Sequence, residues 1–394
     1  MTTTTFIVSL LAAVAFGVSA LSSLVLASRV RSGSIYLPLM LFFLVNALTE
    51  LSALSGVSIF SQINIRLSHL ISFVTIPLLC SLAPLFWIYV RALTSESMRS
   101  WSRKDLFHFT LPILSIALPI VAWLMPSQEF ADVFRPSGID NPRNLLQIMF
   151  ILGVKVIDVL TLLQVGVYIV LIIRRLRSYR VGLTQLFATT EHLELRWFNW
   201  LAMFLLAYLG LSLVSLLAAT LFESPHSLDL WESLIDVGLI TTLAVWSLRQ
   251  KPGLAIETMA IELESRQLQR EDHTKYQNSG LSEQHRSVIA AKLEQAMKVD
   301  KFYRLENLSL SVLAKHIKEL PSYVTQTLNI EIGESFFDYI NSWRIDYASE
   351  ALIKTDETVL DIAVDAGFNS RSSFYKAFKN IKGCTPSEYR KRHR

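Results

Sequence analysis

The segment 359-VLDIAVDAGFNSRSSFYKAFKNIKGCTPSEYRKRHR-394 has the pattern of two helices joined by a tight turn. Ile362 and Ala363 are the expected buried positions of the first helix. Gly367 supplies the turn, where a positive φ is often needed and glycine has no steric cost. Ser370 is placed to cap a second, longer helix. The segment therefore predicts a helix-turn-helix unit at the C-terminal end of the sequence.

The preceding residues predict a similar pair of helices. Ala314 and Ile317 belong to the buried face of one helix, and Pro321 opens the next. A proline is favourable in the first helical turn because its missing N–H would have no partner there. A long helix over about 335–354 then joins this first unit to the second. We expect two helix-turn-helix units, linked by one helix, over residues 281–394.

This pattern resembles the DNA-binding domain of the AraC/XylS family of transcription regulators over about residues 284–390. The resemblance is carried by Phe336, Tyr339, Arg344, Ala348, Ile362, Ala363, Gly367, Phe368, Ser370, Phe374, Phe378, Lys379, Gly383, Thr385, Pro386, Tyr389 and Arg390. One departure is Lys318, which stands where many family members have the glycine of the first turn. A positive φ there would cost about 1 kcal/mol.

The resemblance also implies which side chains face DNA. It aligns with base-facing positions the residues Ser322, Thr325 and Gln326 of the first unit and Arg371, Ser372, Tyr375 and Lys376 of the second. In the major groove Gln can pair with adenine, Thr can contact the thymine methyl group and Arg can pair with guanine. For Arg371 a phosphate contact is an equal alternative.

Basic residues far outnumber acidic ones after Ala366, and Lys379 is one of them. A basic tail can be a solvated face or a contact with anionic lipid. Beside a helix-turn-helix pattern, contact with DNA phosphates is the better interpretation. The expected partners of this domain are double-stranded promoter DNA and RNA polymerase.

The composition before residue 250 is that of a membrane domain. The 394-residue chain is 52% apolar and only 18% charged, whereas soluble domains are about 25% charged. A helix needs roughly 20 apolar residues to cross a bilayer. Seven stretches qualify: about Phe6–Ala27, Tyr36–Ser55, Leu67–Tyr89, Leu106–Met125, Leu145–Ile173, Trp197–Phe222 and Leu228–Leu248. Polar residues interrupt the third and fifth, so six or eight spans are the alternatives to seven.

The sequence thus predicts an all-α protein with three parts. Residues 1–250 form a seven-helix transmembrane bundle with a sensing role, residues 251–280 a linker or signalling helix, and residues 281–394 the AraC-like domain. Lys and Arg gather in the loops after the first, third, fifth and seventh stretches. By the positive-inside rule the N-terminus lies outside a bacterial inner membrane and the C-terminal domain in the cytoplasm. Membrane lipid is therefore another expected partner.

Ionisable residues interrupt the predicted spans at Glu50, His69, Lys155, Asp158, Glu232 and Asp236. A charge near the middle of a membrane helix costs about 2.5–3.5 kcal/mol and usually faces the bundle interior. With the predicted orientation all six lie in the outer half of the bilayer, and Lys155 and Asp158 share a helix face on which they can pair.

One interpretation of these residues is polar contact between helices. The other is a pocket, open to the outside, that binds a small or lipid-like signal through Glu50, His69, Lys155, Asp158 and Asp236. The predicted outer loops are too short to hold a folded extracellular sensor domain.

The sequence of the linker between the two domains predicts an amphipathic helix from Leu254 to Arg270. Leu254 and Ile261 belong to a seven-residue repeat, but Glu257 and Glu264 occupy the alternate positions that a coiled coil needs apolar. The sequence therefore leaves open whether this helix forms a homodimer.

Catalytic and cofactor motifs are missing from the sequence. It contains no GxGxxG, P-loop, HExxH or GxSxG pattern, and no His or Cys residues stand at metal-ligand spacing. We therefore expect a regulator and not an enzyme, with no catalytic residue, metal or cofactor. An alternative is a membrane transporter or lipid-acting enzyme whose DNA-binding tail regulates its own genes, although no inverted internal repeat supports a transporter. Proteolytic release of the DNA-binding part also stays open.

Overall fold

The computed structural model describes residues 3–30, 34–58, 65–95, 101–126, 144–190, 197–221, 227–249, 256–262 and 281–394. Within these residues the regular structure is helical, apart from one isolated bridge between Phe187 and Ser309. The chain forms two compact units. The apolar unit holds Met1–Leu93, Met98–Arg175 and Arg196–Lys251, and the C-terminal unit holds Thr94–Ser97, Leu176–Leu195 and Pro252–Arg394. The all-α prediction is confirmed.

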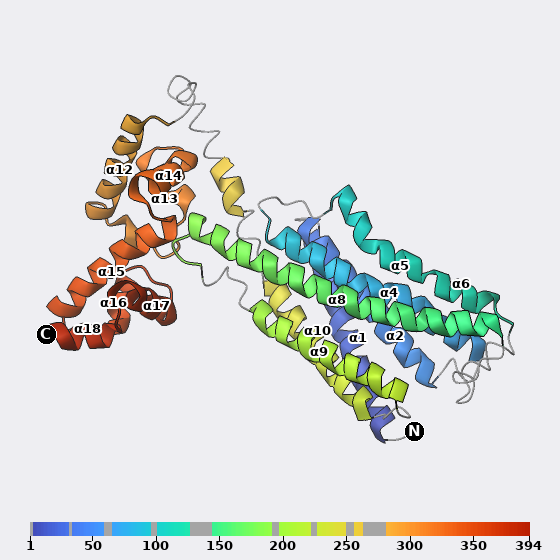
Figure 1. Ribbon diagram of the computed structural model, residues 1–394. Helices are drawn as coiled ribbons and strands as arrows, with labels where there is room; N and C mark the ends of the chain where they lie inside the picture. Colours follow the sequence, from blue (N-terminus) through green and yellow to red (C-terminus); the bar gives the residue numbers. More distant parts are fainter. Residues whose placement is uncertain are drawn as a thin grey trace. The chain divides into compact units, whose positions relative to one another are not determined.

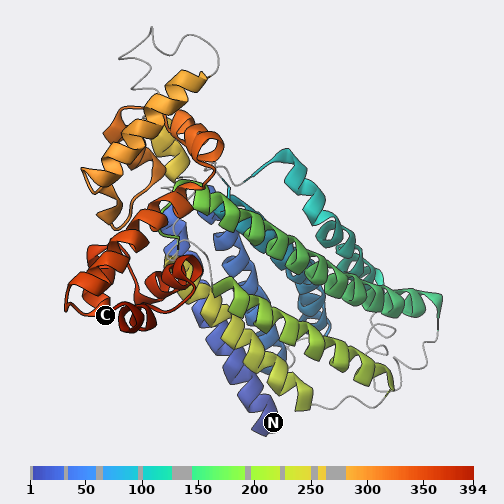
Figure 2. The same cartoon turned by 60° about the vertical axis from the view of Figure 1, so that its left-hand side comes forward.

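Long helices that pack side by side, together with the two short helices α5 and α6, make up the apolar unit (Figures 1 and 2). They are α1 (Thr3–Val30), α2 (Leu37–Ser58), α4 (Ile65–Leu93), α5 (Thr110–Ser115), α6 (Ala117–Leu124), α8 (Leu145–Leu186) up to its residue 175, α9 (Trp197–Leu221) and α10 (Ser227–Arg249). Helix α1 packs against both α2 and α10, α4 packs against α2, and α9 packs against α10.

Six helical segments in the described part of the chain are long and apolar enough to cross a membrane. They coincide with six of the seven predicted spans. The remaining predicted span corresponds to α9, whose apolar described part, Leu201–Val214, is shorter than a span. Large apolar side chains such as Leu24 and Leu163 point outward, with 71% and 61% of their surface exposed. Such outward apolar faces fit a lipid environment, while the count of seven spans stays a prediction.

The C-terminal unit contains the two predicted helix-turn-helix pairs. Its helices are α12 (Glu283–Lys298), α13 (Leu310–Ile317), α14 (Pro321–Thr327), α15 (Phe336–Lys354), α16 (Val359–Asp365), α17 (Arg371–Lys382) and α18 (Pro386–His393). One hydrophobic core surrounds the α13–α14 pair and a second surrounds the α16–α17 pair. Helix α15 contributes buried side chains to both cores, among them Phe336 and Leu352, so it joins the two pairs as the sequence predicted.

Helix α8 continues well beyond the predicted end of the fifth span. The sequence predicted an apolar span to about Ile173 followed by a basic loop, but the helix runs without interruption to Leu186. Charged residues such as Arg174 and Arg177 end the apolar run without ending the helix, because arginine is a good helix former. From Leu176 onward these residues belong to the C-terminal unit.

Part of the predicted linker helix is described. Residues 256–262 are helical. The rest of the predicted helix over 254–270 lies outside the described residues. The domain boundaries at 250 and 280 stay predictions.

Candidate functional site

The turns of the two helix-turn-helix pairs both need a left-handed backbone. Gly367 has a φ of 87°, and a Cβ added there would lie only 2.7 Å from the carbonyl oxygen of Arg304. Lys318 has a φ of 55° at the end of α13. The first turn therefore keeps the geometry that glycine would favour and bears the strain of a side chain instead.

The second helix of the second pair, α17, presents the predicted polar residues on one face. Its core side is held by Phe374 and Phe378, which are fully buried. The side chain of Ser370 accepts a hydrogen bond from the Ser373 N–H at 3.1 Å and caps the helix. The guanidinium of Arg371 lies 5.0 Å from the centre of the Tyr375 ring. Around this pair are the exposed side chains of Ser372, Lys376 and Lys379.

The second helix of the first pair, α14, is shorter and less charged than α17. Ser322 and Gln326 are exposed, one turn apart on the same face. Thr325 is half-buried, and its hydroxyl donates a hydrogen bond to the carbonyl oxygen of Pro321 at 3.1 Å. Since that hydroxyl is occupied within the helix, the methyl group is the part of Thr325 best suited to contact a base.

Three residues of the basic tail are bound to the domain itself. Lys382 forms an ion pair with Asp346 at 2.8 Å. Arg390 donates to the carbonyl oxygens of Leu352 and Glu357 at 3.1 and 2.6 Å. Arg394 pairs with Asp356 at 2.7 Å. Their charges therefore hold α18 and its surroundings together, which the sequence could not distinguish from phosphate contacts.

Arg344 on α15 is the largest fully buried side chain among the described residues. It donates hydrogen bonds to the carbonyl oxygens of Tyr303 and Leu305 at 2.8 and 2.7 Å, and to the Thr189 hydroxyl at 3.2 Å. Burial lowers the pKa of the guanidinium to about 10, so it remains charged at neutral pH. The sequence matched Arg344 to the family pattern but gave no indication of these partners.

The chain that follows α8 pairs with the backbone just before α13, the first helix of the first helix-turn-helix pair. The Ala188 N–H donates to the Leu308 carbonyl oxygen at 3.0 Å. The Thr189 hydroxyl donates to the Glu306 carbonyl oxygen at 3.1 Å. The Asn341 side-chain amide donates to the Ala188 carbonyl oxygen at 3.2 Å. Ala188 itself is 1% exposed and belongs to the first core. The end of α8 is therefore an internal part of the C-terminal unit.

The helical segment 256–262 also packs on the first helix-turn-helix pair. The Glu257 carboxylate accepts a hydrogen bond from the Ser311 N–H at 3.0 Å, in the first turn of α13. Ser309, at the N-cap position of α13, makes no side-chain cap hydrogen bond, so Glu257 caps the helix from outside. Ile261 packs against the first core. An acid that breaks a coiled-coil repeat thus has a structural role here.

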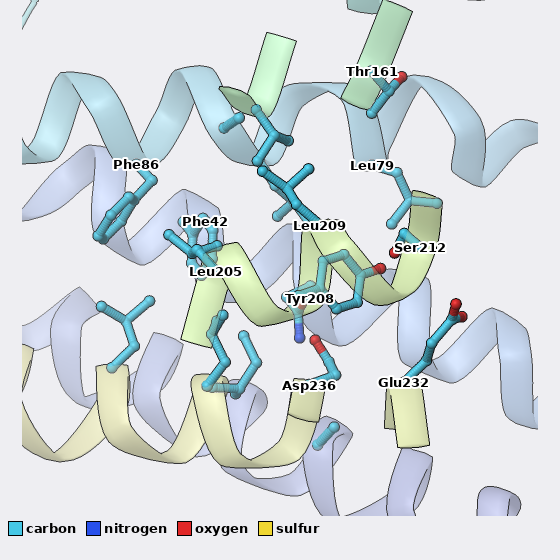
Figure 3. A pocket seen from close by; sticks show the side chains of 18 of the residues that line it. Phe42, Leu79, Phe86, Thr161, Leu205, Tyr208, Leu209, Ser212, Glu232 and Asp236 are labelled. Atoms are coloured by element: carbon cyan, nitrogen blue, oxygen red, sulfur yellow. The ribbon is translucent and has the colours of Figure 1, made fainter. Parts of the chain in front are cut away.

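The apolar unit contains a cavity of about 670 Å³ between α1, α2, α4, α8, α9 and α10. Three of the five predicted signal-binding residues line it: Glu50, Asp158 and Asp236. Glu232 lines it as well, and Tyr208 and Ser212, which the sequence did not single out, lie near Asp236 and Glu232 (Figure 3).

Of the other two predicted signal-binding residues, the structure describes the side chain of one. Lys155 is exposed and does not line the cavity. Among the described residues no ion pair joins it to Asp158, although the two share a helix face. The side chain of His69 lies outside the described residues. The described residues contain no group of His, Cys, Asp and Glu arranged to hold a metal ion.

Comparison with known proteins identifies the C-terminal region. A family of helix-turn-helix domains matches residues 313–392. An uncharacterized HTH-type transcriptional regulator of Staphylococcus aureus (strain COL) is 38% identical over 85 residues, which cover 22% of this chain and 11% of that protein. The uncharacterized HTH-type transcriptional regulator YtdP of Bacillus subtilis (strain 168) is 33% identical over 87 residues, with the same coverage. The chain therefore spans about a tenth of the length of these relatives.

Among solved structures, the C-terminal domain of AraT, a response regulator from Geobacillus stearothermophilus, is 26% identical. It covers 29% of this chain and 88% of that chain, with a TM-score of 0.25.

Proposed function

We propose that this protein, whose C-terminal residues form an AraC-type helix-turn-helix domain, is a membrane-embedded transcriptional regulator. In this proposal the C-terminal unit binds promoter DNA while it remains part of a chain anchored in the membrane. The apolar unit responds to a small or lipid-like signal. RNA polymerase is the expected partner at the promoter.

Sequence-specific contact is proposed for the exposed faces of α14 and α17. Gln326 is suited to adenine and Arg371 to guanine, because each can make two hydrogen bonds to that base in the major groove. Lys376 and Lys379 are exposed and suited to phosphates. Two recognition helices joined through one rigid helix would reach major-groove faces about 34 Å apart.

The orientation is proposed from the loop charges. Lys and Arg after the odd-numbered spans favour an outer N-terminus and a cytoplasmic C-terminal unit in a bacterial inner membrane. This arrangement needs α9 to cross the membrane as a seventh span. It also puts the DNA-binding surface in the compartment that contains the chromosome.

The observation that carries the proposal is the end of α8. One continuous helix contributes residues up to Arg175 to the apolar unit and residues from Leu176 to the C-terminal unit. The chain just beyond it hydrogen-bonds to Asn341 and Arg344 of the helix that joins the two DNA-binding pairs. A change in the packing of α8 in the bundle can thereby reach α15, and with it the two DNA-binding pairs, through the three residues 187–189 that follow the helix.

The test is DNA binding by the full-length chain. Chromatin immunoprecipitation of the tagged protein is expected to recover a small set of promoters. Purified protein in lipid nanodiscs should then bind those promoters in a gel-shift assay. Gln326→Ala and Arg371→Ala are each expected to weaken binding by about 1–3 kcal/mol and to relax specificity at one base position.

Lys298→Ala is the matched control, because Lys298 is an exposed lysine of the same unit that pairs with Glu294 on α12. It should leave the affinity unchanged. No enriched promoter under any growth condition, together with no gel shift, would refute the proposed function.

A further inference from the structure

The charged side chains lining the cavity of the apolar unit all have the same sign. They are Glu50, Asp158, Glu232 and Asp236, and no Lys, Arg or His is among the described residues that line it. Lys155, the basic residue nearest to them in sequence, is exposed outside the lining. Whatever occupies this cavity therefore meets four carboxyl groups and, from the described side chains, no basic group.

The positions of these acids along their helices put them at one end of the cavity. Glu50 lies in the C-terminal half of α2, whereas Glu232 and Asp236 lie in the first turns of α10 and Asp158 in the N-terminal half of α8. On α2 the lining residues Phe42, Asn46 and Glu50 follow one another at intervals of four. Such spacing keeps them on one face, so the lining changes from aromatic through polar to acidic along that helix.

The other end of the cavity is apolar and aromatic. Phe42, Phe86 and Leu205 lie at one end of the view in Figure 3, and Ser212 and Glu232 lie toward the other. The ring centres of Phe42 and Phe86 are 5.8 Å apart. The cavity therefore has an apolar end built for hydrocarbon and an acidic end built for positive charge.

Four carboxyl groups at one end of a cavity give that end a negative potential. This potential would attract the charged group of a bound organic cation, whose apolar body would fill the aromatic end. An anion of the same size and shape would meet four like charges. We propose that this cavity binds an amphiphilic cation, that is, an organic ammonium or phosphonium group attached to a hydrocarbon or aromatic body.

That such a cation is the regulator's signal rests on the proposed function above. Its binding to the cavity does not, because binding can be measured on the purified chain without DNA. The two can therefore fail separately. Loss of promoter binding with intact cation binding would refute only the regulator, and the reverse result would refute only the cation site.

The test uses two probes of matched shape and opposite charge, tetraphenylphosphonium and tetraphenylborate. Full-length protein in nanodiscs of zwitterionic lipid is dialysed to equilibrium against each probe, and uptake by empty nanodiscs is subtracted. We expect saturable binding of one tetraphenylphosphonium per chain. Tetraphenylborate should bind at least about tenfold more weakly, or without saturation.

Variants locate the site. Combined Glu50→Gln and Asp236→Asn substitutions keep the side-chain shapes and remove two charges, and should weaken phosphonium binding at least about tenfold. Lys155→Gln removes a nearby charge outside the lining and should change binding less than about twofold.

Equal affinity of the double variant and the wild type would overturn the proposal. So would tetraphenylborate binding as tightly as tetraphenylphosphonium, a comparison made on the wild type alone and therefore independent of how the variants fold.

Discussion

Gly367 and Lys318 both have a positive φ and occupy equivalent positions in the turns of the two helix-turn-helix pairs. The space around the two residues differs. Gly367 is surrounded by backbone, with the carbonyl oxygens of Tyr303 and Arg304 within 2.8 Å of where a Cβ would lie. These carbonyl groups belong to the segment 303–305, in which the carbonyl oxygens of Tyr303 and Leu305 accept hydrogen bonds from the Arg344 side chain. Lys318 meets no such restriction on its side chain but has a similar backbone conformation. The second turn therefore requires glycine, and the first only favours it.

Substitution at the two turns should accordingly change stability in opposite directions. Gly367→Ala is expected to destabilise the C-terminal unit by about 3 kcal/mol, since left-handed strain and a backbone clash add together. Lys318→Gly should stabilise it by about 0.5–1 kcal/mol, because relief of strain exceeds the entropy cost of glycine.

Hydrogen exchange of the α13 and α16 amides in the purified full-length protein measures both effects. Gly383→Ala is the matched control for a positive φ in open space, because nothing lies within 4 Å of an added Cβ there. It should cost about 1–2 kcal/mol. If Gly367→Ala cost no more than Gly383→Ala, the close approach to Arg304 would have no energetic role.

Among the helices, α8 differs most from its prediction. The sequence predicted a membrane span, but the helix extends beyond that span into the C-terminal unit. It has the apolar character of a membrane span in its first part, and its last turns carry Leu183, which is fully buried in the structure. The bridge between Phe187 and Ser309 continues its attachment. Helix 256–262 adds a second attachment through Glu257. Both act on the first helix-turn-helix pair, not on the second.

Interrupting α8 between Arg177 and Ser178 should uncouple regulation from DNA binding. An insertion of two glycines there breaks the helix, since glycine disfavours helix by about 1 kcal/mol per residue, but leaves Leu183 to Thr189 free to dock. We expect promoter affinity within about twofold of wild type, together with a promoter-reporter activity that no longer changes with growth condition.

The same insertion after residue 130, between two predicted spans, is the control and should leave the condition dependence intact. A reporter that still responds normally after the α8 insertion would show that the signal takes another route, with the helical segment at Glu257 as the next candidate.

For the whole molecule, the direction of the chain in the membrane decides whether the DNA-binding surface can reach DNA. Six helices qualify as spans by length and composition, and α9 does so only in part. With six spans and an outer N-terminus the C-terminal unit would face outward, away from the chromosome. With an outer N-terminus, the proposed function therefore requires seven spans.

Fusions of alkaline phosphatase, which is active only outside the cytoplasm, test this topology. Fusions after residues 130 and 225 should be active, whereas fusions after residues 180 and 394 should be inactive. The fusion after residue 225 is decisive, because it reports whether α9 crosses the membrane. Activity at residue 394 would contradict the predicted orientation, and green fluorescent protein at the same positions should give the reciprocal pattern.

The sequence by itself determined the all-α class, the two helix-turn-helix pairs and the apolar character of the first 250 residues. These features are local, because caps, glycines at turns and runs of apolar residues are set by neighbours within a few positions. Thus Gly367, Ser370 and Pro321 could be assigned before the structure was known, and their geometry agrees.

Only the tertiary structure decided which charges are bound by distant parts of the chain and which stay exposed. Arg390 and Arg371 are equally basic in the sequence, but one is held by the carbonyls of Leu352 and Glu357 and the other lies exposed on α17. Likewise Asp158 lines a cavity and Lys155, three residues away, does not. Such differences depend on partners more than 30 residues distant in the chain, and no local pattern records which distant group will fold against a given side chain.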